Sequence, residues 1–355
     1  MENKLRIAVI KTDGIGDAVL ASPFFFELRK YLKKAHITGI LSPAGAEVLS
    51  GLRVFDEIKI IDPKWLKYGK TFFLTRWLSA LGLLFLVNKG KYDLVIGLRW
   101  QDRLTSLILS LCNAKEKYGY DVKGMGFGIN HKIPAAARGT HVIKRNLLVL
   151  SKILPGRKFT AKPGFSTDLQ SEKRVNELLR DIKRDARRAS LRYIVIHPVS
   201  GHISKDWAID NYKELALRLA KKYDIFIIGA KTDKRVNEIS GRNIHNMAGL
   251  LNVRETGSLI KRSLFVIGND SAAVHIASVF NKKSLTLFSG TALYEEWGAY
   301  GKNSYILAKN VVCRMCELTQ CDKPAHECVE FELNYVEKLI KKILSGRQKK
   351  RIVLY

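Results

Sequence analysis

Apolar positions along the chain fall into short runs separated by longer stretches of helical periodicity. Leu5–Ile10 is a short, mostly apolar run of the kind that forms a buried parallel strand, and the helical stretch Ala18–Lys33 follows it. Further strand candidates in the first half are His36–Leu41, Ile58–Ile61 and Leu94–Leu98. This alternation predicts βαβ units around a mostly parallel sheet.

The same rhythm restarts in the second half of the chain. Its predicted elements are strand Tyr193–Ile196, helix Asn211–Lys222, strand Ile225–Ile228, strand Leu264–Ile267, helix Ala272–Phe280 and strand Ser284–Phe288. A chain of 355 residues, 46% of them hydrophobic, is long and apolar enough for two α/β cores. We therefore expect domains at 1–165 and 191–330, a linker and amphipathic helix at 166–190, and a C-terminal helix with a basic tail at 331–355.

The charge is strongly unbalanced, with 61 Lys and Arg against 33 Asp and Glu and a formal net charge of +28. Such an excess favours an anionic partner: nucleic acid, an acidic membrane surface or a phosphorylated substrate. The basic residues are dispersed, and the chain has no helix-turn-helix, zinc-finger or ribonucleoprotein signature. A nucleic-acid-binding protein is therefore the less favoured interpretation.

The sequence predicts neither a signal peptide nor a membrane span. The apolar run near Lys4–Ile10 is short and soon followed by Lys11 and Asp13. Trp77–Val87 is apolar but shorter than the ~20 residues that cross a bilayer. We expect it to form a core helix rather than to insert into a membrane. A cytosolic chain would keep its five cysteines as thiols or metal ligands.

The first candidate for chemistry is the turn Asp13–Asp17 between a strand and a helix. Gly14 and Gly16 let the backbone approach a ligand, and a helix N-terminus favours anions. The dinucleotide fingerprint needs a third small residue where this chain has Val19, so the turn does not match it. An ordinary tight turn is the alternative.

The second candidate is the loop His197–Trp207, which leaves the carboxyl end of a strand, where open α/β sheets bind ligands. Ser200 and Gly201 offer a hydroxyl and N–H groups to a phosphate, and Lys205 adds a positive charge. Without other evidence, an exposed loop with a solvated lysine explains this segment equally well.

The third candidate is Gly268–His275, where a strand ends and a helix begins. The Ser271 hydroxyl suits an N-cap, and the N–H groups of Ser271–Ala273 form a natural diphosphate cradle. Asp270 is placed to orient the loop or contact a sugar hydroxyl. His275 is expected mainly to pack under the helix.

In order and spacing, these segments together resemble glycosyltransferase family 9, the ADP-heptose:lipopolysaccharide heptosyltransferases. The matching motifs are Lys11–Asp17 with Pro23, His197–Trp207, Asn269–His275 and Phe288–Thr291. The resemblance spans nearly the whole chain. It implies an α/β GT-B fold, with two Rossmann-like domains facing across a cleft, the donor mainly on the second and the acceptor on the first.

The resemblance also implies an inverting transfer that needs neither metal nor resident cofactor. The donor would be ADP-heptose or a related ADP-sugar. The acceptor would be a lipopolysaccharide core or related anionic glycolipid at the inner face of the cytoplasmic membrane, where the enzyme would be peripheral. A non-catalytic sugar-nucleotide binder and a GT-B-type epimerase remain alternatives.

Residue roles follow from the same resemblance. Asp17 would be the general base, with Asp13 as its rival; a helix N-terminus stabilises the carboxylate anion and weakens it as a base unless burial or substrate offsets this. Lys205, Ser200 and the amides of Ser271, Ala272 and Ala273 would hold the donor diphosphate, and Asp233 would lie near the ribose. The family usually has glycine where this chain has Ala272, which leaves the donor's identity open.

The cysteines Cys313, Cys316, Cys321 and Cys328 form a C-x2-C-x4-C-x6-C pattern. Four thiols this close can close a tetrahedral structural zinc site, or they can remain free, oxidation-prone thiols, which we favour. Cys112 lies in an apolar helix and is expected in the core.

Overall fold

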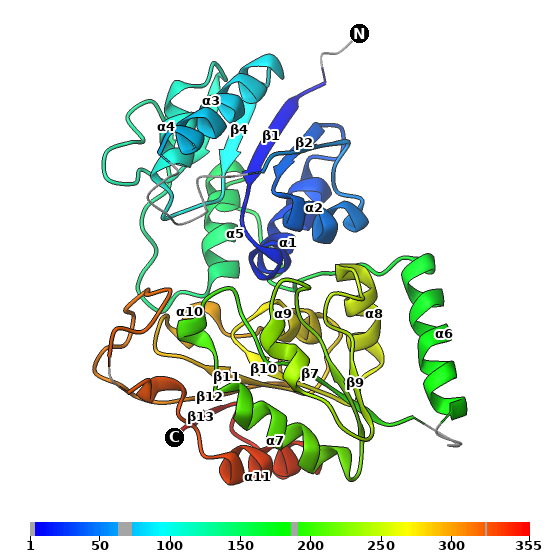
Figure 1. Ribbon diagram of the computed structural model, residues 1–355. Helices are drawn as coiled ribbons and strands as arrows, with labels where there is room; N and C mark the ends of the chain where they lie inside the picture. Colours follow the sequence, from blue (N-terminus) through cyan, green and yellow to red (C-terminus); the bar gives the residue numbers. More distant parts are fainter. Residues whose placement is uncertain (1–3, 63–72, 186–190, 324) are drawn as a thin grey trace. The chain divides into compact units, whose positions relative to one another are not determined.

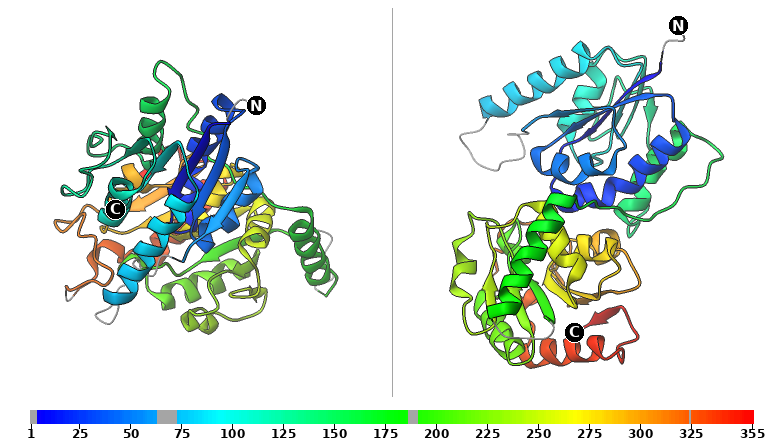
Figure 2. Two further views of the ribbon diagram at one scale, coloured as in Figure 1. Left: turned by 90° about the horizontal axis from the view of Figure 1, so that it is seen from above. Right: turned by 90° about the vertical axis from the view of Figure 1, so that its right-hand side faces the viewer.

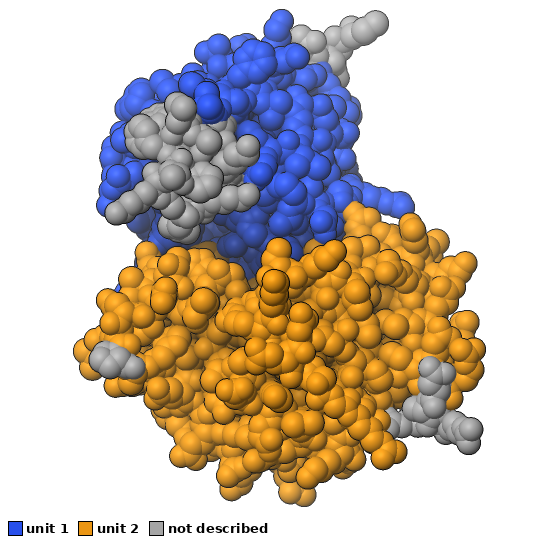
Figure 3. Space-filling model, in the orientation of Figure 1, with its two compact units in different colours: residues 1–164 blue, residues 165–355 orange. Residues whose placement is uncertain are grey.

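A computed structural model describes residues 4–62, 73–185, 191–323 and 325–355. The chain divides into two compact units, unit 1 (Met1–Gly164) and unit 2 (Phe165–Tyr355) (Figure 3).

Unit 1 is built on a parallel sheet with helices on both faces (Figures 1 and 2). Its strand order is β3-β2-β1-β4-β5-β6. The strands are β1 (Arg6–Lys11), β2 (His36–Leu41), β3 (Glu57–Ile60), β4 (Leu94–Gly97), β5 (Glu116–Gly119) and β6 (His131–Lys132). The helices are α1 (Ile15–Tyr31), α2 (Pro43–Leu49), α3 (Phe73–Lys89), α4 (Arg103–Leu111) and α5 (Val142–Ile153).

The central strand of unit 1 is apolar because both of its faces are covered. Residues Ile7–Ile10 of β1 are fully buried. Ala8 and Ile10 belong to the cluster that packs against α3 and α4, and it also contains Cys112, so the core prediction for that cysteine is confirmed. A fully covered parallel strand reads as a continuous apolar run, which explains why it was recognisable in the sequence.

Unit 2 repeats this architecture, with strand order β13-β12-β11-β10-β7-β8-β9 and parallel pairing throughout (Figure 1). The strands are β7 (Tyr193–His197), β8 (Asp224–Ile227), β9 (Ile244–Asn246), β10 (Phe265–Asn269), β11 (Ser284–Phe288), β12 (Ser304–Ala308) and β13 (Ile352–Leu354). The helices are α6 (Leu169–Asp185), α7 (Ile209–Ala220), α8 (Val253–Arg262), α9 (Ala272–Val279), α10 (Tyr294–Trp297) and α11 (Leu333–Leu344). Helices α7 and α11 share one apolar cluster with the sheet.

Each parallel sheet has a switch point, where the chain connections on the two sides of one strand run toward opposite edges of the sheet. In unit 1, β1 lies between β2 and β4; in unit 2, β7 lies between β8 and β10. Open α/β sheets bind ligands outside the carboxyl ends of the strands at such switch points. The three candidate segments follow β1, β7 and β10 and therefore lie at these edges.

The apolar stretch Trp77–Val87 falls within α3, and its side chains Ala80, Leu83 and Val87 are buried in the core of unit 1. None of the helices in the described ranges is both long enough and apolar enough to cross a membrane. The chain between β3 and α3 is basic, with Lys64, Lys67 and Lys70, and these residues lie at 63–72, outside the described residues.

Candidate functional site

The turn after β1 presents Asp17 from the first turn of α1. Gly14 is the N-cap of this helix, with φ −75° and ψ 179°. A Cβ placed on Gly14 would lie 3.7 Å from Asp17 Oδ2, so the carboxylate lies beside the helix N-terminus. Neither Gly14 nor Gly16 has a positive φ. A left-handed backbone is therefore not the reason for glycine at these two positions.

Asp13, on the same turn, is held by two cations. Its carboxylate is 2.7 Å from Lys11 Nζ and 2.6 Å from Arg99 Nε. Burial would raise the pKa of Asp13, but the Lys11 ammonium and the Arg99 guanidinium outweigh it and hold that pKa below its ordinary value. Ser42 Oγ also donates to the Asp13 carbonyl at 2.5 Å. Through these contacts Asp13 holds the turn against the segments that follow β2 and β4.

Arg99 was not among the sequence candidates, although it lies two residues beyond β4. Its guanidinium also lies 3.4 Å from Asp102, the N-cap of α4. The position of Arg99 just after a buried strand was the available signal, but its partner on the β1–α1 turn is 86 residues away in sequence.

In unit 2, the ends of the neighbouring strands β7 and β10 are joined by side chains. His197 Nδ1 and Ser271 Oγ are 2.7 Å apart. Burial lowers the pKa of His197 to about 4, so its imidazole is neutral near pH 7. Ser271 is the N-cap residue of α9, as predicted, but its hydroxyl makes no capping hydrogen bond and contacts His197.

The N-terminus of α9 consequently has no side-chain cap from Ser271. The first-turn N–H groups of a helix have no intrahelical acceptor. Those of Ala272 and Ala273 therefore suit an anion at this position, as the sequence predicted for a diphosphate.

Lys205 lies beside this helix N-terminus, because its ammonium is 2.7 Å from Asp270 Oδ2. The Asp270 side chain is 6% exposed and that of Lys205 is 26% exposed, so a buried carboxylate holds a cation that reaches solvent. His275 Nε2 lies 3.8 Å from the other Asp270 oxygen, and His275 is buried within α9. Lys205 and Asp270, predicted on separate segments, form one cluster.

Asn269, the last residue of β10, connects four groups around this cluster. Its amide nitrogen donates to the Pro198 carbonyl at 2.8 Å and to Asp206 Oδ1 at 2.9 Å. Its oxygen accepts from the Trp207 N–H at 3.2 Å and from the Tyr212 hydroxyl at 2.8 Å. Both hydrogens and both acceptor positions of the amide are thereby used. Asn269 belongs to one of the sequence motifs, but no role was predicted for it.

Asp233 is engaged by Arg235, which also contacts Asp206. Arg235 Nε donates to Asp233 Oδ1 at 2.9 Å, and the same carboxylate accepts from the Arg235 backbone N–H. Arg235 also lies 3.0 Å from Asp206, whose pKa is raised by burial. Arg235 and Asp206 were missed because an Arg and an Asp in loops are usually solvated.

The loop after β7 is folded on itself at Ser200. Its Oγ donates to the His202 carbonyl at 2.7 Å. Gly201 is exposed, and a Cβ there would meet nothing within 4 Å. The predicted phosphate contacts Ser200 and Gly201 thus lie on a loop edge with open space.

The four C-terminal cysteines form no disulfide, and Cys328 lies close enough to the other three to interact with them electrostatically. Cys328 is buried, Cys313 and Cys321 are half-buried, and Cys316 is exposed. Burial raises the pKa of Cys328, and the three other cysteines act in the same direction. Across the described ranges, no group of three or more His, Cys, Asp or Glu has an arrangement that could hold a metal ion.

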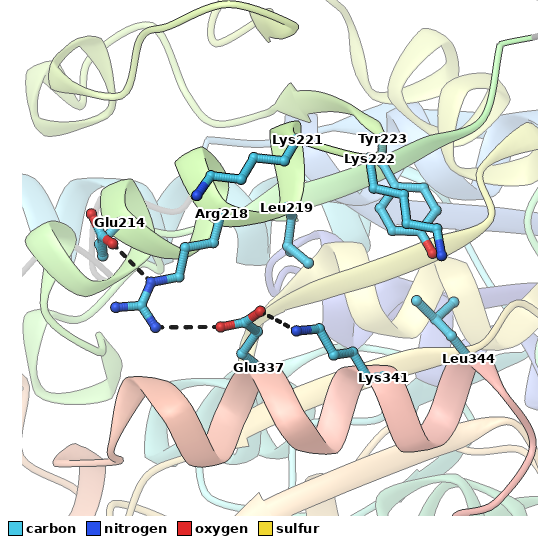
Figure 4. A pocket seen from close by; sticks show the side chains of 9 residues that line it. All are labelled: Glu214, Arg218, Leu219, Lys221, Lys222, Tyr223, Glu337, Lys341 and Leu344. Carbon is cyan, nitrogen blue, oxygen red and sulfur yellow. Dashed lines mark hydrogen bonds and ion pairs between the residues drawn. The ribbon is translucent and has the colours of Figure 1, made fainter.

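A separate cavity of about 700 Å³ lies between α7 and α11 (Figure 4). It is lined by Glu214, Arg218, Leu219, Lys221, Lys222, Tyr223, Glu337, Lys341 and Leu344. Arg218 pairs with Glu214 and Glu337, and Glu337 also pairs with Lys341. The end of α7 leads into the start of β8, so this cavity lies at the amino edge of the sheet. That is the edge opposite the one where α/β sheets bind nucleotides.

Comparison with known proteins identifies the family to which this chain is similar. The sequence model of glycosyltransferase family 9 (heptosyltransferase) matches residues 86–326. The chain is 27% identical over 291 residues to lipopolysaccharide heptosyltransferase 3 of Escherichia coli strain K12, covering 78% of this chain and 80% of that protein. It is 23% identical over 337 residues to lipooligosaccharide heptosyltransferase 2 of Campylobacter jejuni, covering 92% and 95%.

Solved structures share the fold along nearly the whole chain. A family 9 glycosyltransferase from Veillonella parvula superposes with a TM-score of 0.75 at 17% identity, over 98% of this chain and 99% of that one. ADP-heptose lipopolysaccharide heptosyltransferase II of E. coli gives 0.70 at 14% identity, over 96% and 99%. The predicted α/β GT-B fold is confirmed, and the chain belongs to glycosyltransferase family 9, the heptosyltransferases, and is a glycosyltransferase.

Proposed function

We propose that this enzyme transfers heptose, or a related sugar, from an ADP-sugar to a lipopolysaccharide core or related cell-envelope glycolipid, with inversion and without a metal. The observation that carries the donor half is the side-chain-uncapped N-terminus of α9 beside the Lys205–Asp270 pair. Related structures were solved with ADP and with ADP-2-deoxy-2-fluoro heptose, each at 16% identity to this chain.

On this proposal, the donor diphosphate lies against the start of α9. The N–H groups of Ala272 and Ala273 and the Lys205 ammonium compensate the charge that develops on the leaving ADP. Ser200, Gly201 and Ser271 add polar groups around the phosphates. Asp270 keeps the Lys205 ammonium in place, and Asp233, which Arg235 orients through both carboxylate oxygens, accepts hydrogen bonds from the ribose hydroxyls.

The acceptor hydroxyl is activated by Asp17. The carboxylate takes the hydroxyl proton as the oxygen attacks the anomeric carbon, and the bond from that carbon to the ADP oxygen breaks on the opposite face. One displacement of this kind inverts the anomeric centre. Asp13 is not assigned this role, because its carboxylate is committed to Lys11 and Arg99.

A nucleotide panel followed by a transfer assay tests the proposal. ADP and ADP-heptose should raise the melting temperature more than UDP, GDP or their sugars. ADP-heptose with a heptose-deficient lipopolysaccharide core should then yield an elongated core with inverted linkage. Stabilisation without transfer would indicate a sugar-nucleotide binder, and an isomerised or free sugar made without acceptor would indicate an epimerase.

Replacing Lys205 by Ala should weaken ADP binding about tenfold, because a charge-assisted contact to phosphate is lost. Isothermal titration calorimetry with ADP measures this directly. Lys338→Ala, a change of an exposed lysine on α11, serves as control. Unchanged ADP affinity in Lys205→Ala would remove Lys205 from the donor site.

Transfer should be unaffected by EDTA, since the proposed stabilisation of the leaving ADP uses only N–H groups and an ammonium. The rate with EDTA and the rate with added Mg²⁺ or Mn²⁺ should agree with the untreated rate. Loss of activity that a divalent ion restores would place a metal in the mechanism.

A membrane glycolipid as acceptor would also explain the large positive net charge of the chain. A glycolipid substrate keeps a peripheral enzyme at an anionic surface, where each well-placed Lys or Arg contributes about 1 kcal/mol. The net charge of +28 fits docking at the inner face of the cytoplasmic membrane.

A further inference from the structure

Helix α3 carries apolar side chains on two opposite faces. Ala80, Leu83 and Val87 face the core of unit 1. On the other side Leu78 is 58%, Leu81 57% and Phe85 68% exposed. Residues spaced at i, i+3 and i+7 share one side of a helix, so these three form a single exposed stripe. Below, Leu78, Leu81 and Phe85 are called the α3 stripe.

Among the described side chains of α3, the position next to the α3 stripe at Gly82 leaves it uncovered. Gly82 lies beside Leu81, and a Cβ at that position would meet nothing within 4 Å. Single exposed leucines are ordinary on protein surfaces, whereas large apolar side chains aligned together mark an interaction surface. The α3 stripe therefore needs a partner that buries apolar groups.

The charges near the α3 stripe indicate which partner this is. Helix α3 contains no Asp or Glu, and Lys89 and Lys91 are exposed at its C-terminal end. Unit 1 as a whole has 28 Lys and Arg against 12 Asp and Glu. A second copy of this chain would bring the same positive charge to the contact and be repelled. An anionic lipid surface offers an apolar interior under negative headgroups, which complements both features.

We propose that the α3 stripe inserts into the headgroup–acyl boundary of an anionic bilayer and anchors unit 1 to it. Because the opposite face of α3 is packed in the core, the helix lies along the surface of unit 1, with its stripe facing the lipid. The proposal rests on the proposed function in one respect, namely that the acceptor is a membrane glycolipid. Insertion adds an apolar contact, which salt does not screen, to the electrostatic attraction between the protein and the membrane.

Vesicle binding with a matched pair of variants tests this. The stripe variant is Leu78→Gln/Leu81→Gln/Phe85→Gln. The control variant, Leu148→Gln/Leu169→Gln/Leu217→Gln, changes three leucines that are exposed on other helices. Partition is measured on vesicles of phosphatidylcholine mixed with phosphatidylglycerol and on phosphatidylcholine alone, at low and high salt.

The wild type and the control variant should bind anionic vesicles and keep part of that binding at high salt. The stripe variant should bind about tenfold or more weakly at high salt, because the apolar contribution is lost. Equal partition of stripe and control variants would overturn the proposal. So would a wild-type dimer that the stripe variant converts to monomer, because the stripe would then be a contact between copies.

A second measurement reports the depth of the helix. Tryptophan placed by Leu81→Trp should be quenched by brominated phospholipids, and one placed by Leu169→Trp should not. Equal quenching of both would contradict the proposal.

Failure of this proposal can be told apart from failure of the proposed function. Transfer to a water-soluble acceptor fragment without acyl chains should be unchanged in the stripe variant. If the wild type transfers no sugar to any acceptor, the proposed function fails, whereas the vesicle comparison still decides the role of α3.

Discussion

Asp17→Asn is expected to reduce the rate of sugar transfer by about 100-fold or more, while ADP affinity stays at the wild-type value. Asparagine keeps the size of the side chain beside the N-terminus of α1 but cannot accept the acceptor's proton. The contacts that we assign to the donor lie in unit 2, so its binding is not affected. Single-turnover transfer with saturating ADP-heptose separates the chemical step from binding.

Asp13→Asn is the matched control on the same turn. Two cations, Lys11 and Arg99, would lose their anion, so this variant should melt at a lower temperature. Its transfer rate, measured well below that temperature, should fall less than that of Asp17→Asn. Near wild-type turnover in Asp17→Asn, together with a large loss in a folded Asp13→Asn, would assign the base to Asp13.

The buried strands were predictable from sequence because their environment is uniform. Strands β2 and β11 have the bounds His36–Leu41 and Ser284–Phe288 that their apolar runs predicted. Strand β1 runs one residue later than predicted, from Arg6 to Lys11, because Lys11 is itself buried and bonded to Asp13. A run covered by helices on both faces is apolar from end to end, and its pattern needs no knowledge of distant partners.

Of the edge strands, β3 was predicted one residue late, whereas β6, β9 and β13 were not predicted. Strand β6 has only two residues, His131 and Lys132, and neither is fully buried; β13 lies in the segment expected to be a basic tail. Strand β13 pairs Ile352 with Ile306 of β12, and a local pattern does not contain that pairing. Edge strands with few buried side chains lack the apolar run on which prediction depends.

In the candidate site too, local features could be predicted from the sequence, whereas contacts between distant residues could not. The motifs drew attention to Lys205 and Asp270, but their ion pair joins residues 65 apart. The contact between His197 and Ser271 likewise spans 74 residues. Local sequence identified the loops; the partners of their side chains depend on which strands are neighbours in the sheet.

Asn269→Ala is expected to have the largest effect on the stability of unit 2, lowering its free energy of unfolding by about 3 kcal/mol or more. The substitution leaves the Trp207 N–H, the Tyr212 hydroxyl and the Asp206 carboxylate without the amide that bonds to them in a buried place. Each orphaned buried group costs about 1–3 kcal/mol. Tyr212→Phe removes only one of these bonds and should cost about 1 kcal/mol.

The same substitution should weaken ADP binding, because Asn269 ties the loop that carries Lys205 to the end of β10. Hydrogen exchange of the full chain should show lost protection in peptides from β7 and β10 and unchanged protection in β1 and β4. Calorimetry should show weaker ADP binding in Asn269→Ala and wild-type binding in Tyr212→Phe. If Asn269→Ala instead unfolds and binds ADP like the wild type, the loop is positioned by the Lys205–Asp270 and His197–Ser271 contacts without the amide.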